Sequence, residues 1–290
     1  ETLGCTSVIC TDKTGTLTKN EMTVQKIWIP GAFFSVSGVG YSLEGEIHPA
    51  RNERNTGDEQ TLKQFFIAGS LCSNARLISN EENSLQRTVL GDPTEAAILV
   101  AAAKYGISYE EENHNYPRVK EFPFDSRRKR MSTVHYTDNS YVVYLKGAPK
   151  VVLDLSKEYL QGSQVIQLSE EKRSEIMRVN DSLAEQGLRI LAIAMRNLSS
   201  DSSFDEPDDV EHDITFLGLI AMMDPPRAEV ATAVQKCHHA HIRIIMITGD
   251  YGLTAKSIAR RIGIVTGDNP RIVTGSDLDR MADGELKKIL

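Results

Sequence analysis

The chain has 290 residues, with 40 Asp and Glu against 33 Lys and Arg and a formal net charge of −7 at neutral pH. This length allows about two domains and a sizeable buried core. The acidic balance argues against a nucleic-acid-binding body, because such proteins attract the phosphate backbone with a surplus of basic side chains. The longest apolar run, residues 216–223, is far shorter than the roughly 20 residues that a membrane helix needs.

The four cysteines, Cys5, Cys10, Cys72 and Cys237, show neither a Cys-x-x-Cys spacing nor the density of a disulfide scaffold. We therefore expect reduced thiols in a cytosolic compartment. No signal peptide is visible, the chain starts abruptly in what should be the approach to a strand, and residues 285–290 end it without a capping signal. These features indicate a soluble piece of a larger protein.

A short apolar strand followed by a carboxylate is the first chemical signal. Residues 8–10, Val-Ile-Cys, are typical of a strand buried on both faces of a parallel sheet. Asp12 is therefore predicted at the carboxyl end of a strand, the edge at which open α/β sheets bind ligands. An aspartate there can attack phosphorus, provided that a cation such as Lys13 or a magnesium ion offsets the repulsion between carboxylate and phosphate.

Residues 12–18, Asp-Lys-Thr-Gly-Thr-Leu-Thr, resemble the phosphorylation signature of the P-type cation-transporting ATPases. The flanks, residues 1–4 and 19–23, resemble the calcium-pump-like branch, type II, of that family. An aspartate that only caps a turn after a strand is the usual explanation of an isolated Asp-Lys pair. Such a turn does not by itself require three threonines around one glycine, so we favour the functional reading.

Residues 91–97, Gly-Asp-Pro-Thr-Glu-Ala-Ala, predict the start of a helix. Asp92 can cap it, Pro93 suits its first position, and Gly106 is expected to end it. Capping alone would explain these residue types. The block also resembles the nucleotide-domain motif of the same pumps, which would place Glu95 beside the adenine.

An aromatic residue followed by a basic run leads into a pair of predicted strands. Residues 122–132 precede and enter the predicted strand 131–136, and a second strand is expected at 141–145. Such a run can be a solvated surface, but a ring that stacks on a base beside cations also suits a nucleotide pocket. The segment resembles the adenine-stacking segment of the pumps, with Phe124 at the stacking position and Ser126 where some members carry an arginine.

Residues 146–149, Lys-Gly-Ala-Pro, end the second of these strands and match a motif whose lysine lines the ATP site of the pumps. Gly147 would let a planar ligand approach the backbone closely. Arg189 opens the predicted strand 188–194 and resembles an arginine that faces the nucleotide phosphates. A solvated lysine and a charge at a strand edge are the alternative readings of Lys146 and Arg189.

Residues 215–223 predict a buried strand that leads into a turn rigidified by two prolines. The turn, Asp-Pro-Pro-Arg, resembles the hinge of the pumps, in which Asp224 and Arg227 would couple the nucleotide and phosphorylation domains.

Residues 242–247 predict a second buried strand, which ends at Thr248, Gly249 and Asp250. Parallel strands bring their carboxyl ends to one edge of a sheet. We therefore expect these three residues and Asp12 to surround the same phosphate.

The remaining pattern predicts other helices, one strand and several irregular segments. Helices are expected at 61–72, 168–186, 228–241 and 253–262, a strand at 22–29, a hairpin loop at 31–45, and polar segments without regular structure at 51–60, 74–87 and 197–210.

The resemblance implies an α/β protein. It implies an incomplete phosphorylation domain, Rossmann-like and of the haloacid-dehalogenase-like fold, in residues 1–22 and 223–290. It implies an inserted α+β nucleotide-binding domain on an antiparallel sheet in residues 23–222.

The resemblance also implies ATP and Mg²⁺ as cofactors. Asp12 and Thr14 would hold the metal, and the phosphoryl group would pass to Asp12 and drive cation transport, with calcium as the family-level expectation, at the cytoplasmic face of a membrane. The implied catalytic residues are Asp12, Lys13, Thr14, Thr248, Gly249 and Asp250, and the implied nucleotide-site residues are Glu95, Phe124, Lys146, Gly147, Arg189, Asp224 and Arg227.

The family's second signature, Gly-Asp-Gly-x-Asn-Asp, is not found in the chain, nor are sequences for an actuator domain or ion-binding membrane helices. The chain is therefore expected to bind ATP, to phosphorylate itself poorly and to need the rest of a pump as its partner. Two alternatives stay open: a soluble phosphatase or phosphotransferase, and a nucleotide-binding module without catalysis. The phosphatase reading is disfavoured because Thr14 stands where such enzymes usually place a second aspartate.

Overall fold

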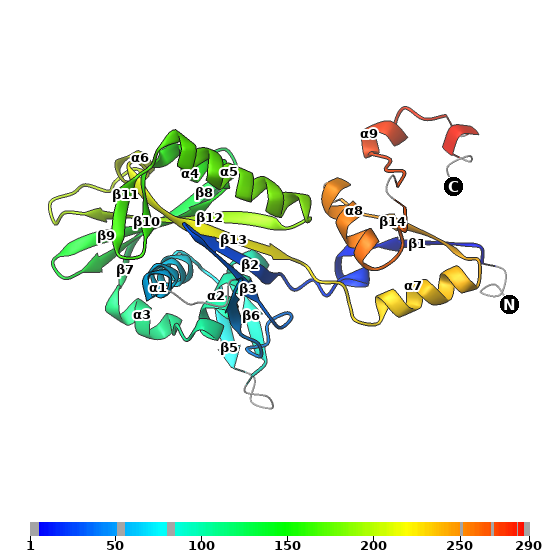
Figure 1. Cartoon of the computed structure of the whole chain (residues 1–290), viewed down its shortest axis with the longest axis horizontal. Helices are drawn as coiled ribbons and strands as arrows, with labels where there is room; N and C mark the ends of the chain where they lie inside the picture. The colour runs from blue at the N-terminus through cyan, green and yellow to red at the C-terminus, as the bar shows by residue number, and fades with distance from the viewer. Residues whose placement is uncertain are drawn as a thin grey trace. The chain divides into compact units, whose positions relative to one another are not determined.

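In the computed structural model, the described residues are 6–50, 56–79, 85–249, 252–267, 270–282 and 284–286. The chain forms two compact units, and each is described by itself (Figure 1). The larger unit is the continuous segment Asn20–Pro225, and the smaller unit combines Glu1–Lys19 with Pro226–Leu290. The assignment of these units to a nucleotide-binding and a phosphorylation domain stays a prediction. No described helix combines the length and the apolar character that a bilayer crossing requires.

The larger unit is built on a ten-stranded sheet with the path β4-β3-β2-β13-β12-β9-β8-β7. Off this path, β10 pairs with β13 and β11 pairs with β10; the β10–β13 pair is parallel and every other pair in this sheet is antiparallel. The sheet therefore agrees with the predicted antiparallel architecture. Its strands are β2 (Thr23–Ile29), β3 (Ala32–Val36), β4 (Ile47–Pro49), β7 (Arg118–Asp125), β8 (Arg130–Thr137), β9 (Ser140–Gly147), β10 (Ser156–Gln161), β11 (Gln164–Gln167), β12 (Arg189–Leu198) and β13 (Ile214–Met223).

Helices cover both faces of this sheet, which gives the three layers visible in Figure 1. On one face α1 (Thr56–Leu71) and α2 (Pro93–Tyr105) bury Phe66 and Ile98 against strand residues such as Ile193. On the other face α4 (Pro149–Leu155) and α5 (Glu170–Glu185) pack around Phe216 and Ile176. Because side chains alternate along a strand, β12 and β13 supply both cores. Two short helices complete the unit, α3 (Tyr109–Asn115) and α6 (Pro207–Val210).

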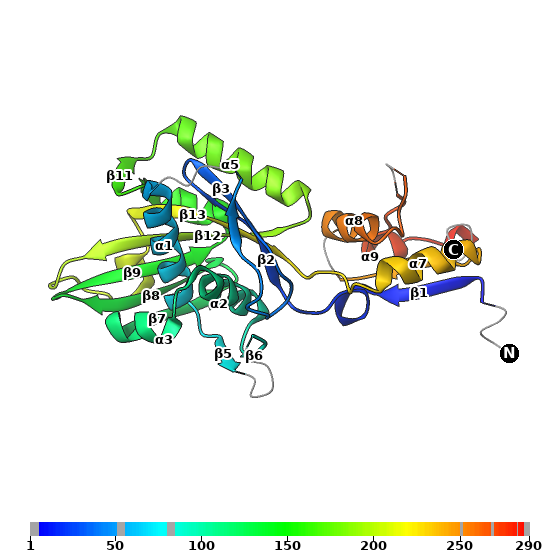
Figure 2. The ribbon, with the colours of Figure 1, turned by 60° about the horizontal axis from the view of Figure 1, so that its bottom comes forward.

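The unit begins and ends on neighbouring strands. In β2 and β13, Thr23 pairs with Met223 and Trp28 pairs with Leu219. Figure 2 shows the blue β2 beside the yellow β13, two segments that are far apart in the sequence.

The predicted starts of α2 and α5 are confirmed by their caps. The Asp92 carboxylate accepts hydrogen bonds from the backbone N–H groups of Thr94 (2.8 Å) and Glu95 (3.2 Å), and Gly106 ends α2 with a φ of 93°. Ser169 caps α5 by accepting from the N–H of Lys172 at 3.2 Å. These contacts satisfy donors that the first helical turn leaves unpaired.

Several local expectations are wrong. Helix α1 begins at Thr56, five residues before the predicted start at 61, and β3 lies inside the segment 31–45 that was expected to be a loop. The predicted irregular segment 74–87 instead enters a hairpin of β5 (Arg76–Ser79) and β6 (Arg87–Leu90). The first turn of α1 and the segment 74–87 are mostly polar, so tertiary packing and strand pairing decide their conformation. Residues 51–55 and 80–84 lie outside the described residues.

The smaller unit contains the parallel pair β1 (Val8–Asp12) and β14 (Arg243–Ile247), with Asp12 in register with Ile247. Helix α7 (Val230–His239) precedes β14, and α8 (Gly252–Arg261) and α9 (Gly275–Leu278) follow it. The prediction that both strands are buried on both faces is wrong, since β1 alternates between exposed and half-buried residues and Ile247 is 58% exposed. Among the described residues this sheet has two strands, too narrow for its helices to bury both faces. The haloacid-dehalogenase-like fold of this unit stays a prediction.

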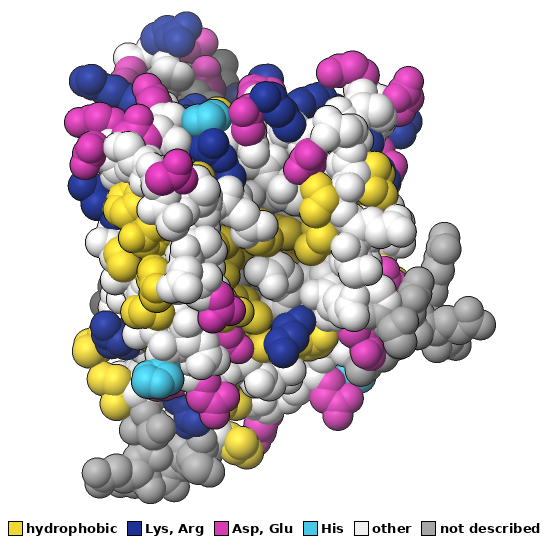
Figure 3. All heavy atoms as spheres, turned by 90° about the vertical axis from the view of Figure 1, so that its left-hand side faces the viewer, with side chains coloured by type: hydrophobic (Ala, Val, Ile, Leu, Met, Phe, Trp, Pro, Cys, Tyr) yellow, Lys and Arg dark blue, Asp and Glu magenta, His cyan; other side chains and the backbone are white. Residues whose placement is uncertain are grey.

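The left-hand side of the molecule in Figure 1, where β9, β11 and α3 lie, is shown as a surface in Figure 3. Basic and acidic side chains intermix along its upper part, and hydrophobic side chains gather below them, across the middle of the face. Neither sign of charge forms a continuous field on this face.

His135 is a fully buried titratable group in the larger unit. Its Nδ1 lies 2.8 Å from the carbonyl oxygen of Tyr116, and its Nε2 lies 2.9 Å from the hydroxyl of Thr133. Burial lowers the pKa of His135 from 6.5 to about 4, and the nearby Arg118 acts in the same direction. The folded chain therefore holds this imidazole neutral at pH 5, where the unfolded chain protonates it.

This difference predicts a pH-dependent loss of stability. The contribution of His135 is fully present above the unfolded pKa of 6.5 and is lost as the pH falls toward 4. From pH 7 to pH 5 the free energy of unfolding should fall by about 2 kcal/mol through this residue. Urea denaturation at the two pH values measures the change, and His135→Gln should show a smaller drop by that amount. Equal pH dependence of both proteins would contradict the prediction.

Candidate functional site

The loop after Asp12, residues 13–17, which we call the Asp12 loop, begins at the same edge of the two-stranded sheet at which β14 ends. Because Asp12 pairs with Ile247 in parallel register, Thr248 and Gly249 follow at the edge where Asp12 lies. Asp12 is exposed. The structure thus brings together three of the predicted catalytic residues, while Asp250 lies outside the described residues. Their chemical role stays a prediction.

The backbone after Asp12 forms a tight turn over residues 13–17. Asp12 Oδ1 accepts from the N–H of Lys13 at 2.8 Å, and both the N–H (3.0 Å) and the hydroxyl (3.1 Å) of Thr18 donate to the Lys13 carbonyl. Gly15 adopts a φ of 75°, which favours glycine. The turn itself therefore explains Gly15 and Thr18, a structural role that the sequence alone did not show. Thr14 is exposed.

Lys13 was predicted to offset the charge of a phosphate, and its side chain is instead 5% exposed. In this structure the ammonium group therefore does not stand open to solvent beside Asp12. Backbone N–H groups of the loop are the alternative source of positive potential at this edge.

Arg227 holds the Asp12 loop. Its Nη2 donates to the carbonyl of Gly15 at 2.9 Å, its Nε donates to that of Thr16 at 3.2 Å, and its backbone N–H donates to that of Leu17 at 3.0 Å. The sequence predicted Arg227 at the nucleotide site. In the structure its guanidinium and backbone N–H groups instead donate to carbonyl groups of the Asp12 loop. In the larger unit, Asp224 accepts from the N–H of Glu21 at 3.3 Å.

Lys146 and Glu95, predicted separately, form a partly buried ion pair in the larger unit. Lys146 Nζ lies 2.7 Å from Glu95 Oε1 and also donates to the hydroxyl of Ser73 (3.2 Å) and the carbonyl of Cys72. An ammonium group has three donors, and these contacts use all of them. Lys146 therefore supports the end of α1 in this structure, a role that the motif did not indicate.

Glu95 also fixes the segment after α1. Its Oε2 accepts from the backbone N–H groups of Asn74 at 2.7 Å and Ala75 at 2.9 Å. With Lys146 on the other oxygen, the carboxylate keeps little free acceptor capacity for a base.

The basic run after Phe124 forms a turn, residues 125–130, that we call the basic turn. The Asp125 carboxylate accepts from the N–H groups of Arg128 (2.8 Å) and Arg127 (2.9 Å), and these hydrogen bonds lower its pKa. Phe124 is 64% exposed at the start of the turn. An exposed phenyl ring beside exposed cations is the arrangement that base stacking requires.

Gly147 lets the basic turn pack against the end of β9. A Cβ at this glycine would lie 2.7 Å from the Lys129 carbonyl oxygen and 2.7 Å from Arg130 Cβ. That carbonyl also accepts from the N–H of Ala148 at 3.0 Å. The sequence predicted a glycine here so that a ligand can approach closely. The structure adds a second reason, because the basic turn itself packs against Gly147.

The predicted nucleotide residues lie at one end of adjacent strands. Gly147 pairs with Arg130 on β8 and with Ala192 on β12, and Arg189 is exposed at the start of β12. The structure therefore brings Phe124, Lys146, Gly147 and Arg189 to the same end of the sheet.

Two residues of this region were not singled out from the sequence. Lys129 was one of four basic residues in a run, and its φ of 54° and its place against Gly147 distinguish it only in the structure. Glu211 contacts the turn from 81 residues away, and nothing in its own neighbourhood marks it.

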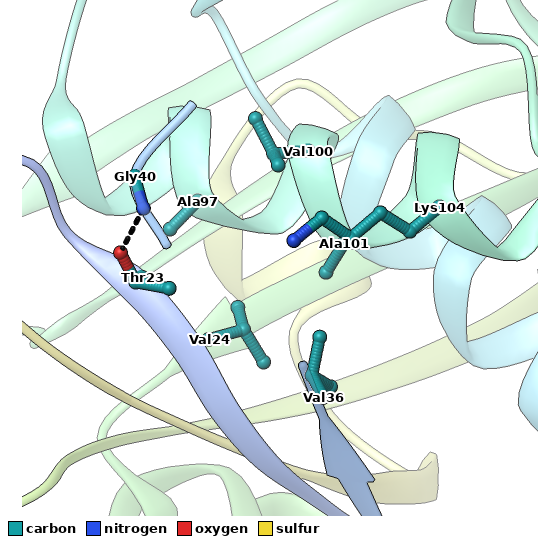
Figure 4. A pocket seen from close by; sticks show the side chains of 8 residues that line it. All are labelled: Thr23, Val24, Val36, Gly40, Ala97, Val100, Ala101 and Lys104. Atoms are coloured by element: carbon teal, nitrogen blue, oxygen red, sulfur yellow. Dashed lines mark hydrogen bonds between the residues drawn. The ribbon is translucent and has the colours of Figure 1, made fainter. Parts of the chain in front are cut away.

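A mostly apolar hollow lies elsewhere in the larger unit, between α2 and β2 (Figure 4). Lys104 is its one charged lining residue; it donates to the carbonyl of Ser37 at 2.8 Å, and burial lowers its pKa. The hollow contains no predicted site residue. Its lining residues are Thr23, Val24, Val36, Gly40, Ala97, Val100, Ala101 and Lys104.

Residues 61–229 match the sequence model of the family described as P-type ATPase, cytoplasmic domain N. The chain belongs to the P-type ATPase family. Similar proteins are the calcium-transporting ATPase of Bacillus subtilis, 38% identical over 100% of this chain, and the cation-transporting ATPase pma1 of Synechocystis, 37% identical over 99%. Calcium-transporting ATPase 1 of Saccharomyces cerevisiae is 36% identical over 100%. The chain spans 30–32% of the length of these relatives.

In this P-type ATPase chain, Gly147→Ala should destabilise the larger unit. The added methyl group forces apart the basic turn and β9, and overpacking of this kind costs about 1–3 kcal/mol. Urea denaturation measures the change, with Gly275→Ala as control because nothing lies within 4 Å of a Cβ there. Equal stability of Gly147→Ala and the unchanged protein would contradict the packing argument.

Proposed function

We propose that this chain is the nucleotide-binding and phosphorylation part of an ATP-driven cation pump. The observation that carries the proposal is the pairing of β1 with β14, which leaves an exposed Asp12 beside Thr248 and Gly249 at one strand edge. The named relatives transport calcium or other cations, and calcium is the cation that we propose here.

The proposed chemistry is phosphoryl transfer to Asp12. A carboxylate oxygen of Asp12 forms a bond to the γ-phosphorus of ATP, the bond from that phosphorus to the bridging oxygen breaks, and ADP leaves with the electron pair. Thr248, Gly249 and Asp250 would orient the phosphoryl oxygens, while Arg227 keeps the loop in place through the Gly15 carbonyl.

The donor set at Asp12 suits a magnesium ion. Mg²⁺ prefers oxygen ligands and usually keeps several waters with one or two carboxylates, and Asp12 offers an exposed carboxylate next to the exposed Thr14. When bound, the ion would neutralise charge between carboxylate and phosphate.

For nucleotide binding we propose Phe124 as the stacking ring, Lys129 and Arg189 as cations near the phosphates, and Glu95 with Lys146 as the wall of the site. Since the ammonium donors of Lys146 already bind protein groups, its contribution to the nucleotide site is mainly to hold Glu95 and the end of α1 in place. The bulk of the affinity then depends on Phe124 and the exposed cations of the turn.

Phe124→Ala should weaken ATP binding about tenfold, because stacking of a base on an aromatic ring contributes roughly 1–3 kcal/mol. Calorimetric titration with ATP and Mg²⁺ measures the affinity. The control is Phe33→Ala, a partly exposed phenylalanine of the same unit that packs against Trp28. Similar affinity in the Phe124 variant and the unchanged chain would remove the ring from the site.

Asp12→Asn tests the phosphorylation step. In the full-length protein, incubation with ATP and Mg²⁺ should add one phosphoryl group that hydroxylamine removes, and the substitution should abolish it. This chain alone should bind ATP with little or no adduct in an intact-mass measurement. A phosphoryl group on another residue would refute the assignment of Asp12.

A further inference from the structure

Glu211 is a buried carboxylate whose side-chain partners all lie in or beside the basic turn. Its side chain is 0% exposed. Its Oε1 accepts from Arg128 Nη1 at 2.6 Å and from the Ser132 hydroxyl at 2.8 Å, and its Oε2 accepts from Arg130 Nε at 2.6 Å. One carboxylate thus pairs with two of the four basic side chains of the run.

A buried ion pair is weak evidence for stability, because desolvation of the charges offsets most of their attraction. Its geometric effect on the turn is more direct. Arg128, held by Glu211, also donates from Nη2 to the carbonyl of Pro123 at 2.8 Å, the peptide that precedes Phe124. Arg130, held by the same carboxylate, pairs with Gly147.

Glu211 therefore fixes the basic turn on both flanks. On one side it fixes the peptide before Phe124, and on the other the strand position after Lys129. Because Arg128 and Arg130 form ion pairs with Glu211, Arg127 and Lys129 are the exposed cations of the turn. The ring and the cations proposed for the nucleotide are thus oriented by one carboxylate from a distant part of the chain.

We propose that Glu211 is a positioning residue for the nucleotide: it sets the spacing between the stacking ring of Phe124 and the ammonium group of Lys129. The inference rests on the proposed nucleotide function and deepens it. Preorganisation of this kind strengthens binding because the ligand does not have to order the turn.

The test compares Glu211→Gln with two controls in the full chain. The variant keeps the side-chain volume and removes the charge. Glu158→Gln makes the same change on β10, where Glu158 Oε1 accepts from Gln167 at 2.8 Å. Arg173→Met removes a part-buried donor from the carbonyls of Leu153 and Ser156 and serves as a destabilised control without contact to the turn.

Two readouts are needed, both at a temperature at which circular dichroism shows every variant folded. Calorimetry with ATP and Mg²⁺ should show about tenfold weaker binding for Glu211→Gln, and less than about twofold change for both controls. Amide NMR signals of residues 124–130 in the nucleotide-free chain should shift in Glu211→Gln and stay in place in Arg173→Met.

The outcomes separate the two proposals. If the unchanged chain binds no ATP, the proposed function fails and this inference fails with it. If the unchanged chain binds ATP and Glu211→Gln binds it equally well, the inference alone is wrong. Equal loss of affinity in Glu211→Gln and Arg173→Met would assign the effect to general destabilisation and likewise overturn the positioning role.

Discussion

The carbonyl groups at the end of α1 need donors, and two cations from the sheet supply them. Arg118 on β7 donates to the carbonyls of Leu71 and Ser73, the latter at 2.6 Å, and Lys146 on β9 donates to that of Cys72. Unpaired carbonyls at a buried helix end would cost free energy, and cations are favourable at the negative end of the helix dipole. This constraint joins the helical layer to the strands and holds Glu95 through Lys146, so the candidate nucleotide region depends on it.

Much of the larger unit follows from local chemistry that the sequence displays. Asp92, Pro93 and Gly106 mark the ends of α2 by their capping roles, and Ser169 does so for α5. Strands with long apolar runs, such as β13, are equally visible. The hairpin of β5 and β6 was not, because each strand has only four residues, two of them polar, and the segment around them is mostly polar.

In the candidate sites, too, one part could be predicted from the sequence and another could not. Parallel pairing of two strands was enough to predict that Asp12 and Thr248 meet at one edge. The direction in which a cation points was not predictable: Lys13 is buried, Arg227 serves the loop carbonyls, and Lys146 turns toward α1. A motif specifies which residue occupies a position, whereas its hydrogen-bond partners come from elements that fold against it from elsewhere in the chain.

The pairing of Thr23 with Met223 has a consequence for modularity. The larger unit starts and finishes on adjacent strands, so its two ends are neighbours in space. A segment with this geometry can be transplanted into another protein at a single surface turn, or cut out and closed on itself by a short linker, without breaking a strand pair.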